Sequence, residues 1–215
     1  MKKTLMSILL TTTAMLSQMN TALADSQAVV FVGNNWDGTV NVFNSQNYSK
    51  VGVINVVPDK QARMKEILLN PIKLVAFQAV RNLIGEGHDQ LVDDMYSSND
   101  GKLLIASRPS FADVVAIDIA TGKIVWRFVV DGYRSDHMAL SPDGTKVAVS
   151  ASTGNVVHIL DVNTGKQVGK FASGNSPHEN VYSKDGSKIY HASIGYVFTP
   201  LDPYFFLITH NSQPL

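Results

Sequence analysis

The chain has 215 residues, contains no cysteine, and carries 18 basic and 18 acidic residues, which gives a formal net charge of zero. The lack of cysteine excludes a disulfide-stabilised fold, so stability must come from an apolar core. No cluster of Lys and Arg forms a phosphate-binding pattern, and nucleic acid is therefore not an expected partner.

The N-terminus has the pattern of a secretory signal peptide. Two cations, Lys2 and Lys3, precede an apolar run over residues 5–16, and small residues lead to Ala24. We expect a signal peptide over residues 1–24, cleaved after Ala24, and a mature chain that is periplasmic or secreted. The apolar run is too short to span a bilayer and no later segment is a better candidate, so no membrane span is expected.

Two turn motifs recur with the same period along the chain. The sequence Asp-x-x-Thr-Gly-Lys occupies residues 118–123 and returns at residues 161–166. A second motif, Asp-Gly followed within two residues by Lys, has its glycine at Gly101, Gly144 and Gly186. Both series share a period of about 43 residues, and each Asp-Gly pair suits a tight hairpin because glycine tolerates positive φ.

One complete repeat predicts four short strands. They lie at Met138–Leu140, Val147–Val149, Val156–Leu160 and Gln167–Phe171. Four antiparallel strands in a repeat of this length are typical of a β-propeller blade, so the predicted fold class is all-β. The preceding repeat runs from about Leu91 to Val130, and a final repeat begins near His178 and loses its pattern after Thr199.

An earlier, partial blade is expected at residues 28–32 and 39–43. About three to four blades are thus visible in a propeller domain expected over residues 25–215, whereas closed rings have roughly four to eight. We expect an incomplete ring, either a fragment of a larger one or a ring completed by another chain. The aromatic segment 201–210 breaks the pattern, and is either the scar of a truncation or an ordinary closing strand.

A helical insertion is predicted over residues 58–85, between the first two blades. Asn70 and Pro71 supply an N-cap and a proline at the first helical position, and Gly85 suits the helix end. The apolar residues at helical spacing predict the buried face, namely Ile72, Val75, Ala76, Ala79, Val80 and Leu83. The insertion either packs on the propeller or serves as a lid or partner-docking element.

The repeated Asp-x-x-Thr-Gly-Lys and Ser-Pro-Asp-Gly-Thr-Lys motifs resemble the YVTN/YncE-like β-propeller repeat family, within the quinoprotein amine dehydrogenase beta-chain-like superfamily. The resemblance covers residues 91–193. It implies the fold, but the superfamily includes substrate-binding proteins, lactonase-like enzymes and quinoprotein subunits, so function must be argued from the site.

Residues 116–126 also resemble the tryptophan-docking motif of quinoprotein dehydrogenase propellers, with Trp126 at the end of the motif. The motif occurs once, and the vicinal cysteines of many such enzymes are missing from this sequence. We therefore interpret Trp126 as a residue that packs between blades.

A pair of ionisable residues stands seven and eight positions before the glycine of each Asp-Gly turn. These pairs are Asp93 and Asp94, Asp136 and His137, and His178 and Glu179. Because the first strand of every propeller blade lines the central channel, we expect the six side chains to meet at one channel mouth. Such a set would bind a divalent metal, orient a small polar ligand, or act as acid and base. The alternative is that the pairs mark only the solvated start of each strand.

Three further residues are candidates for the same site. His191 occupies a second-strand position where neighbouring blades carry Ile105 and Val149, so it needs a hydrogen-bond partner or a ligand. Arg108 and Arg134 lie in connections between strands. There a guanidinium would clamp a ligand carboxylate, pair with the channel carboxylates, or form an intramolecular ion pair.

The motifs favour a binding or scaffold protein over an enzyme. No nucleophile elbow, phosphate-binding loop or HExxH motif occurs in the sequence. We expect an exported β-propeller that binds a small polar ligand, a divalent metal or a protein partner at the channel mouth. Two alternatives are a metal-dependent lactonase-like hydrolase and a quinoprotein-like oxidoreductase subunit.

Overall fold

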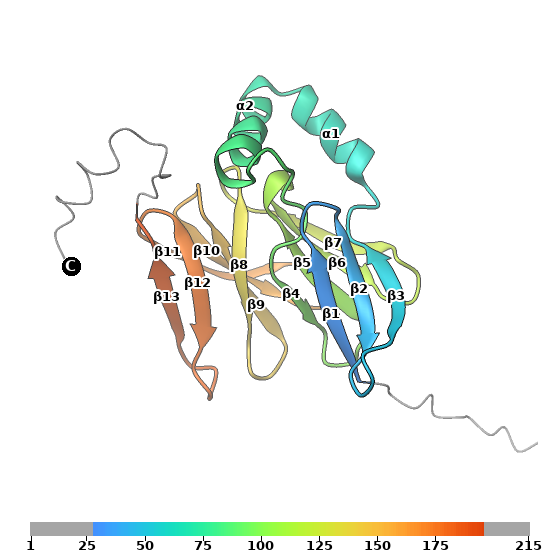
Figure 1. Cartoon of the computed structure of the whole chain (residues 1–215). Coiled ribbons are helices and arrows are strands. Elements are labelled where there is room, and N and C mark those ends of the chain that lie inside the picture. Colours follow the sequence, from blue (N-terminus) through green and yellow to red (C-terminus); the bar gives the residue numbers. More distant parts are fainter. Residues whose placement is uncertain (1–27, 196–215) are drawn as a thin grey trace, which may run out of the picture.

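The chain folds into four antiparallel β-sheets and one helical insertion (Figure 1). The computed structural model describes residues 28–195. Each sheet is formed by strands that are consecutive in the sequence. The predicted signal peptide and the aromatic segment 201–210 lie outside the described residues.

Two of the sheets are complete four-stranded meanders. One contains β4 (Met95–Ser97), β5 (Leu103–Arg108), β6 (Asp113–Asp118) and β7 (Ile124–Val129). The next contains β8 (Ser135–Leu140), β9 (Lys146–Ala151), β10 (Val156–Asp161) and β11 (Gln167–Ala172). In both sheets the strands pair in chain order. The four strands predicted for one repeat are confirmed, and so is the equivalent set one period earlier.

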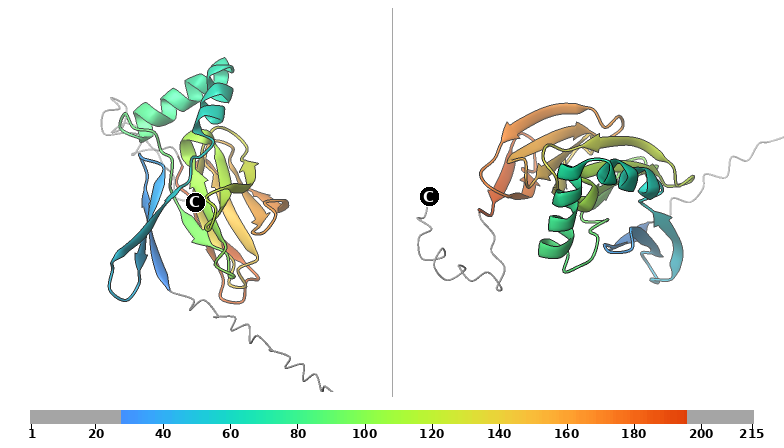
Figure 2. Two further views of the ribbon diagram at one scale, coloured as in Figure 1. Left: turned by 90° about the vertical axis from the view of Figure 1, so that its right-hand side faces the viewer. Right: turned by 90° about the horizontal axis from the view of Figure 1, so that it is seen from above.

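The other two sheets are shorter. The first contains β1 (Val29–Asn34), β2 (Thr39–Asn44) and β3 (Lys50–Asn55), and the last contains β12 (Pro177–Tyr182) and β13 (Ile189–Ser193). Strands β1 and β2 match the predicted partial blade, whereas β3 has no counterpart among the predicted strands. Seen from above, the four sheets follow an arc (Figure 2).

The ends of this arc are open within the described part of the chain. Neighbouring sheets pack through fully buried side chains such as Val115 and Val149. On the end sheets, apolar side chains are exposed, among them Val32, Val53 and Tyr190. A sheet presents such side chains to solvent when no further sheet packs on it. The described residues therefore form an incomplete ring, as the repeat count predicts.

Three of the hairpin turns are held by an aspartate. Asp100, Asp143 and Asp185 each accept a 2.6 Å hydrogen bond from the serine hydroxyl two residues earlier. Each also accepts a bond from the backbone N–H two residues later. These bonds favour the ionised carboxylate and lower the pKa of each aspartate to about 2. The glycine that follows has a φ between 67° and 70°, as an Asp-Gly hairpin turn requires.

We expect these three turn aspartates to make stability depend on pH in the acidic range. Their pKa is about 2 in the folded chain against an ordinary value of 3.8. Their contribution is therefore complete above the ordinary pKa and is lost as the pH falls through the folded one. The free energy of unfolding, measured with urea at about pH 5, 3 and 2, should fall with decreasing pH in the unmodified chain. It should fall less in a variant in which all three aspartates are replaced by asparagine. Equal losses in the two proteins would mean that these carboxylates titrate normally.

The insertion contains two helices at one end of the sheets (Figure 1). Helix α1 spans Lys60–Leu68, and α2 spans Pro71–Ala79 and continues as a π-helical turn over Val80–Ile84. The Asn70 side chain accepts hydrogen bonds from the N–H groups two and three residues later, so the predicted N-cap is confirmed. The predicted helical insertion is confirmed with it.

The predicted buried face of the second helix is wrong at three of its six residues. Ile72, Val75 and Leu83 are 64%, 70% and 67% exposed. Val80 is 4% exposed, as predicted, and so is Phe77, which was not among the predicted residues. The helix is apolar around most of its circumference, so helical spacing fits more than one stripe. The stripe that includes the bulky Phe77 packs against the sheets, and the stripe through Ile72 and Val75 faces solvent.

Among residues 28–195, no single helix is long and apolar enough to cross a membrane. The two helices of the insertion reach the required length and composition only when taken together, as a pair bent by 114°.

Candidate functional site

The six ionisable residues predicted at the strand starts come together at the end of the sheets from which the insertion emerges. They are Asp93 and Asp94 before β4, Asp136 and His137 in β8, and His178 and Glu179 in β12. We call them the mouth cluster.

A β-bulge orients each pair of this cluster. Strand pairing is interrupted between Ser135 and Met138, and again between Pro177 and Asn180, so two residues oppose one on the neighbouring strand. The first pair, Asp93 and Asp94, likewise lies opposite one residue, Ser107. The Asp93 N–H donates to the Ser107 carbonyl, and the Ser107 N–H donates to the Asp94 carbonyl. A bulge re-aims side chains that regular alternation would send to opposite faces.

His137 is at the centre of the mouth cluster. Its Nδ1 lies 3.3 Å from a carboxylate oxygen of Asp94 and 3.8 Å from one of Glu179, and its Nε2 lies 4.0 Å from Asp136. The His137 and His178 rings are tilted by 32°, with their centres 4.2 Å apart. One imidazole therefore approaches ionisable groups from three consecutive sheets.

The carboxylates around His137 favour its charged form. The hydrogen bond with Asp94, aided by the charges of Asp93 and Asp136, raises the pKa of His137 to about 9. Burial acts to raise the pKa of Asp94, but hydrogen bonds from His137 and from the Met138 N–H hold it below its ordinary value. Burial and the Asp136 charge raise the pKa of Asp93 to about 6. At neutral pH and without a bound cation, an imidazolium thus offsets part of the acidic charge, and a metal ion that binds His137 displaces its proton.

Two buried carboxylate oxygens of the mouth cluster have no hydrogen-bond partner among the described residues. One is Oδ1 of Asp136, a residue that is 2% exposed, and the other is Oδ2 of Asp93. The other oxygen of Asp136 pairs with Arg134, one of the alternatives that the sequence left open for this arginine. Buried anionic oxygens are normally paired or bound to a cation, so this arrangement fits a cation site.

The donor atoms of the mouth cluster are close enough to share one ion. Asp136, His137 and His178 each offer one donor atom, and these three atoms lie within 4.8 Å of one another. The same is true of Asp93, Asp94 and His137. Because His137 belongs to both groups, they describe overlapping ligand sets. Mixed carboxylate and imidazole donors suit first-row divalent ions such as Mn²⁺ and Zn²⁺.

Arg108, a predicted ligand-binding residue, is instead buried in a salt-bridge network, which is the intramolecular ion pair that the sequence left open for this arginine. Its guanidinium is fully inaccessible and donates to Asp113 at 2.7 Å and 2.8 Å, to Asp59 at 2.6 Å, and to the Val56 carbonyl at 3.0 Å. Asp59 directly precedes α1, so the network fastens the insertion to β5 and β6. Because its donors are used within the protein, we leave Arg108 out of the candidate site.

His191 also lies outside the mouth cluster. Its Nδ1 is 2.9 Å from the side-chain oxygen of Asn180, and its Nε2 is 2.7 Å from the Ser173 hydroxyl. Burial lowers the pKa of His191, which favours the neutral imidazole. The polar partners that the sequence predicts for this histidine are therefore supplied by the protein itself.

Trp126 packs between two sheets, as the docking-motif interpretation predicts. It is 8% exposed, and its Nε1 donates a 2.9 Å hydrogen bond to the carbonyl of Val162, which follows β10 in the next sheet. Gly165 lies against the indole, where a Cβ would come within 2.4 Å of the ring. This contact between sheets accounts for the motif.

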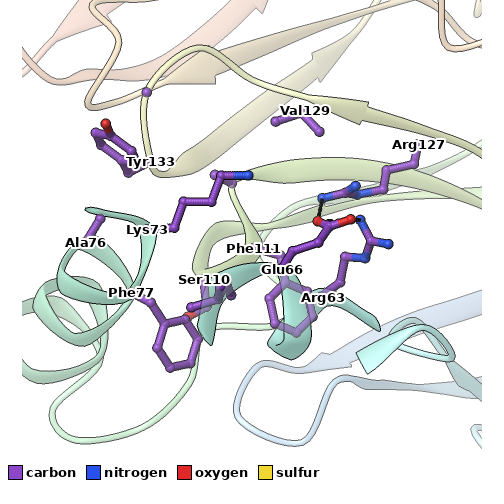
Figure 3. Close-up of a pocket in the computed structure, with 13 residues that line it drawn as sticks. Arg63, Glu66, Lys73, Ala76, Phe77, Ser110, Phe111, Arg127, Val129 and Tyr133 are labelled. Atoms are coloured by element: carbon purple, nitrogen blue, oxygen red, sulfur yellow. Dashed lines mark hydrogen bonds and ion pairs between the residues drawn. The ribbon is translucent and has the colours of Figure 1, made fainter. Parts of the chain in front are cut away.

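A pocket separate from the mouth cluster opens between the insertion and the sheet of β4–β7 (Figure 3). It has about 460 Å³ of space, part of which is open to solvent. Phe77 and Phe111 form its floor, and three cations line it, namely Arg63, Lys73 and Arg127. None of the residues that line it belongs to the mouth cluster.

No protein-family model and no curated protein matches the sequence. Solved structures match through their fold. One chain of a mitotic checkpoint complex aligns with 77% of this chain at 14% sequence identity, with a TM-score of 0.54. One chain of Kuenenia stuttgartiensis hydrazine synthase aligns with 78% of it at 17% identity, with a TM-score of 0.56. Both matched chains are β-propellers.

The fold is a β-propeller. The two complete sheets are blades, and the two shorter sheets are parts of blades. This chain spans 43% and 40% of the lengths of the two matched propeller chains. Strands β4, β8 and β12 are the first strands of their blades and line the channel side of the propeller, so the six clustered residues lie at a channel mouth.

The residues around the pocket were not among the sequence candidates. Lys73 comes from the insertion, Arg127 from the last strand of a blade, and Tyr133 from the connection to the next blade. No repeat or spacing relates these three positions, because only the docking of the insertion brings them together.

Proposed function

We propose that this chain is an exported β-propeller binding protein that holds a divalent cation at the mouth cluster and, through it, a small polar ligand. The Asp136 carboxylate carries the proposal, because it is buried, fixed by Arg134 on one oxygen and without a hydrogen bond on the other among the described residues. Export rests on the N-terminal sequence, and membership of the YVTN/YncE-like repeat family rests on the turn motifs.

The proposed cation takes its ligands from side chains that are already oriented. Asp94 is anchored by a 2.8 Å hydrogen bond from the Met138 N–H, and Asp136 by its pair with Arg134. The Glu179 side chain is 51% exposed, so a ligand that approaches the cluster would contact it. A bound divalent ion would attract an oxygen atom of the ligand as a Lewis acid.

Cation binding is tested by titrating chelator-treated protein with Zn²⁺ and with Mn²⁺ in a calorimeter. We expect one ion per chain, and an affinity lower by about tenfold or more in His137→Ala and in His178→Ala. His88→Ala is the matched control, because His88 stacks on Trp36 at 3.8 Å, outside the mouth cluster. The proposal would be wrong if the unmodified chain bound neither ion, or if it and the three histidine variants bound the ion with equal affinity.

A metal-dependent hydrolase of the lactonase type is the second candidate. It is favoured by Glu179, whose half-exposed carboxylate lies 3.8 Å from His137 and would serve as a base beside the cation. Following acid release from a simple lactone in the presence of the cation-loaded protein separates the two functions. We expect no cation-dependent hydrolysis. Hydrolysis that Glu179→Gln abolishes would replace the binding function with the hydrolase.

A further inference from the structure

The pocket beneath the insertion has more basic than acidic lining residues (Figure 3). Arg63, Lys73 and Arg127 line it, and Glu66 is the one acid among the described residues that do so. Glu66 already pairs with Arg63 at 2.7 Å and contacts Arg127 at 3.5 Å. The lining therefore keeps an excess of positive charge, which attracts anions.

Lys73 is the cation best placed to meet a ligand. Its side chain extends from the first turn of α2 and lines the pocket (Figure 3). Within residues 28–195 its ammonium group has neither a carboxylate nor a hydrogen-bond partner, whereas Arg63 is tied to Asp59 and Arg127 to Asp113. An ammonium group without a partner gains a charge-assisted hydrogen bond when a carboxylate approaches it.

The remainder of the pocket is apolar. Ile67, Phe77 and Phe111 are buried and form the inner surface, and the half-exposed Val129 and Tyr133 stand opposite the insertion (Figure 3). A small inorganic anion would neutralise the charge but would leave the apolar surface of Val129 and Tyr133 in contact with water. A ligand that combines an anionic group with an apolar group would both pair with the positive charge of the lining and cover its apolar surface.

We propose that this pocket binds a small organic carboxylate, whose apolar group contacts Val129 and Tyr133 and whose carboxylate meets Lys73. The pocket shares no residue with the mouth cluster, so this proposal does not depend on the proposed cation.

The probe is benzoate, added to chelator-treated, isotope-labelled protein and followed by amide chemical shifts. We expect the largest shifts at Ala76 and Tyr133, which line the pocket. Benzyl alcohol has a similar shape without the charge, and should bind at least about five times more weakly. Lys73→Met should weaken benzoate binding by a similar factor and leave benzyl alcohol binding unchanged.

The matched control is Lys65→Met, because Lys65 is an exposed residue of α1 that does not line the pocket. It should bind benzoate as the unmodified chain does. The proposal is overturned if benzoate causes no shifts around the pocket, if benzyl alcohol binds equally well, or if both lysine variants weaken benzoate alike. Because Lys73 is itself exposed, its replacement is expected to leave the unfolding transition unchanged, which a urea titration checks.

Discussion

Replacing Arg108 with methionine is expected to lower the free energy of unfolding by about 3–5 kcal/mol. Arg108 and Asp113 are both fully buried and share hydrogen bonds of 2.7 Å and 2.8 Å. Without the guanidinium, the Asp113 carboxylate keeps only its pair with Arg127, and the buried Val56 carbonyl loses a donor. A buried charge without its main partner retains the full cost of desolvation.

Arg127→Met is the matched control for this prediction. Arg127 also pairs with Asp113, but its side chain is 23% exposed, so we expect a loss below about 2 kcal/mol. Adding Asp113→Asn to Arg108→Met should restore part of the lost stability, because the amide removes the buried charge. Urea unfolding measures all four proteins. A loss in Arg108→Met no larger than that in Arg127→Met would contradict the role given to the buried network.

Replacing Trp126 with alanine is expected to cost about 3–5 kcal/mol of stability, as for other buried aromatic residues. The indole fills the space between two blades, lies against Gly165, and donates to the Val162 carbonyl. Trp126→Phe keeps most of the apolar contact and loses the hydrogen bond, so its cost should be about 1 kcal/mol.

The neighbouring Val125 supplies the control for Trp126. It lies on the same strand, β7, but is 51% exposed, so Val125→Ala should change stability by no more than about 0.5 kcal/mol. Urea unfolding should give the largest loss of stability for Trp126→Ala, a smaller loss for Trp126→Phe and the smallest for Val125→Ala. Equal costs for Trp126→Ala and Val125→Ala would mean that the tryptophan does not hold the two blades together.

The repeating features of this fold could be predicted from the sequence because each has a local physical cause. Asp143 and Gly144 mark a turn through their own hydrogen bonds and φ, and the same turn recurs one period away in either direction. Counting back from these turns identified the residues of the mouth cluster. The bulges that aim them inward have no sequence mark of their own, since they depend on pairing with the next strand.

The predictions that proved wrong concern features that depend on contacts between distant parts of the chain. Arg108 is paired with Asp59, which lies 49 residues earlier, and nothing near either residue indicates that pairing. The apolar stripe of the insertion was misassigned because Ile72 and Phe77 lie on different sides of a helix that is apolar almost all round. Which side is buried is decided by the surface on which the helix packs.

The cation site is tested most directly by diffraction from crystals of the chain grown with Zn²⁺, recorded on both sides of the zinc absorption edge. The account predicts an anomalous difference peak within bonding distance of Asp136, His137 and His178, about 2.0–2.2 Å from the donor atoms. A map with no anomalous peak at the mouth cluster, from crystals in which zinc is in excess over the protein, would contradict it.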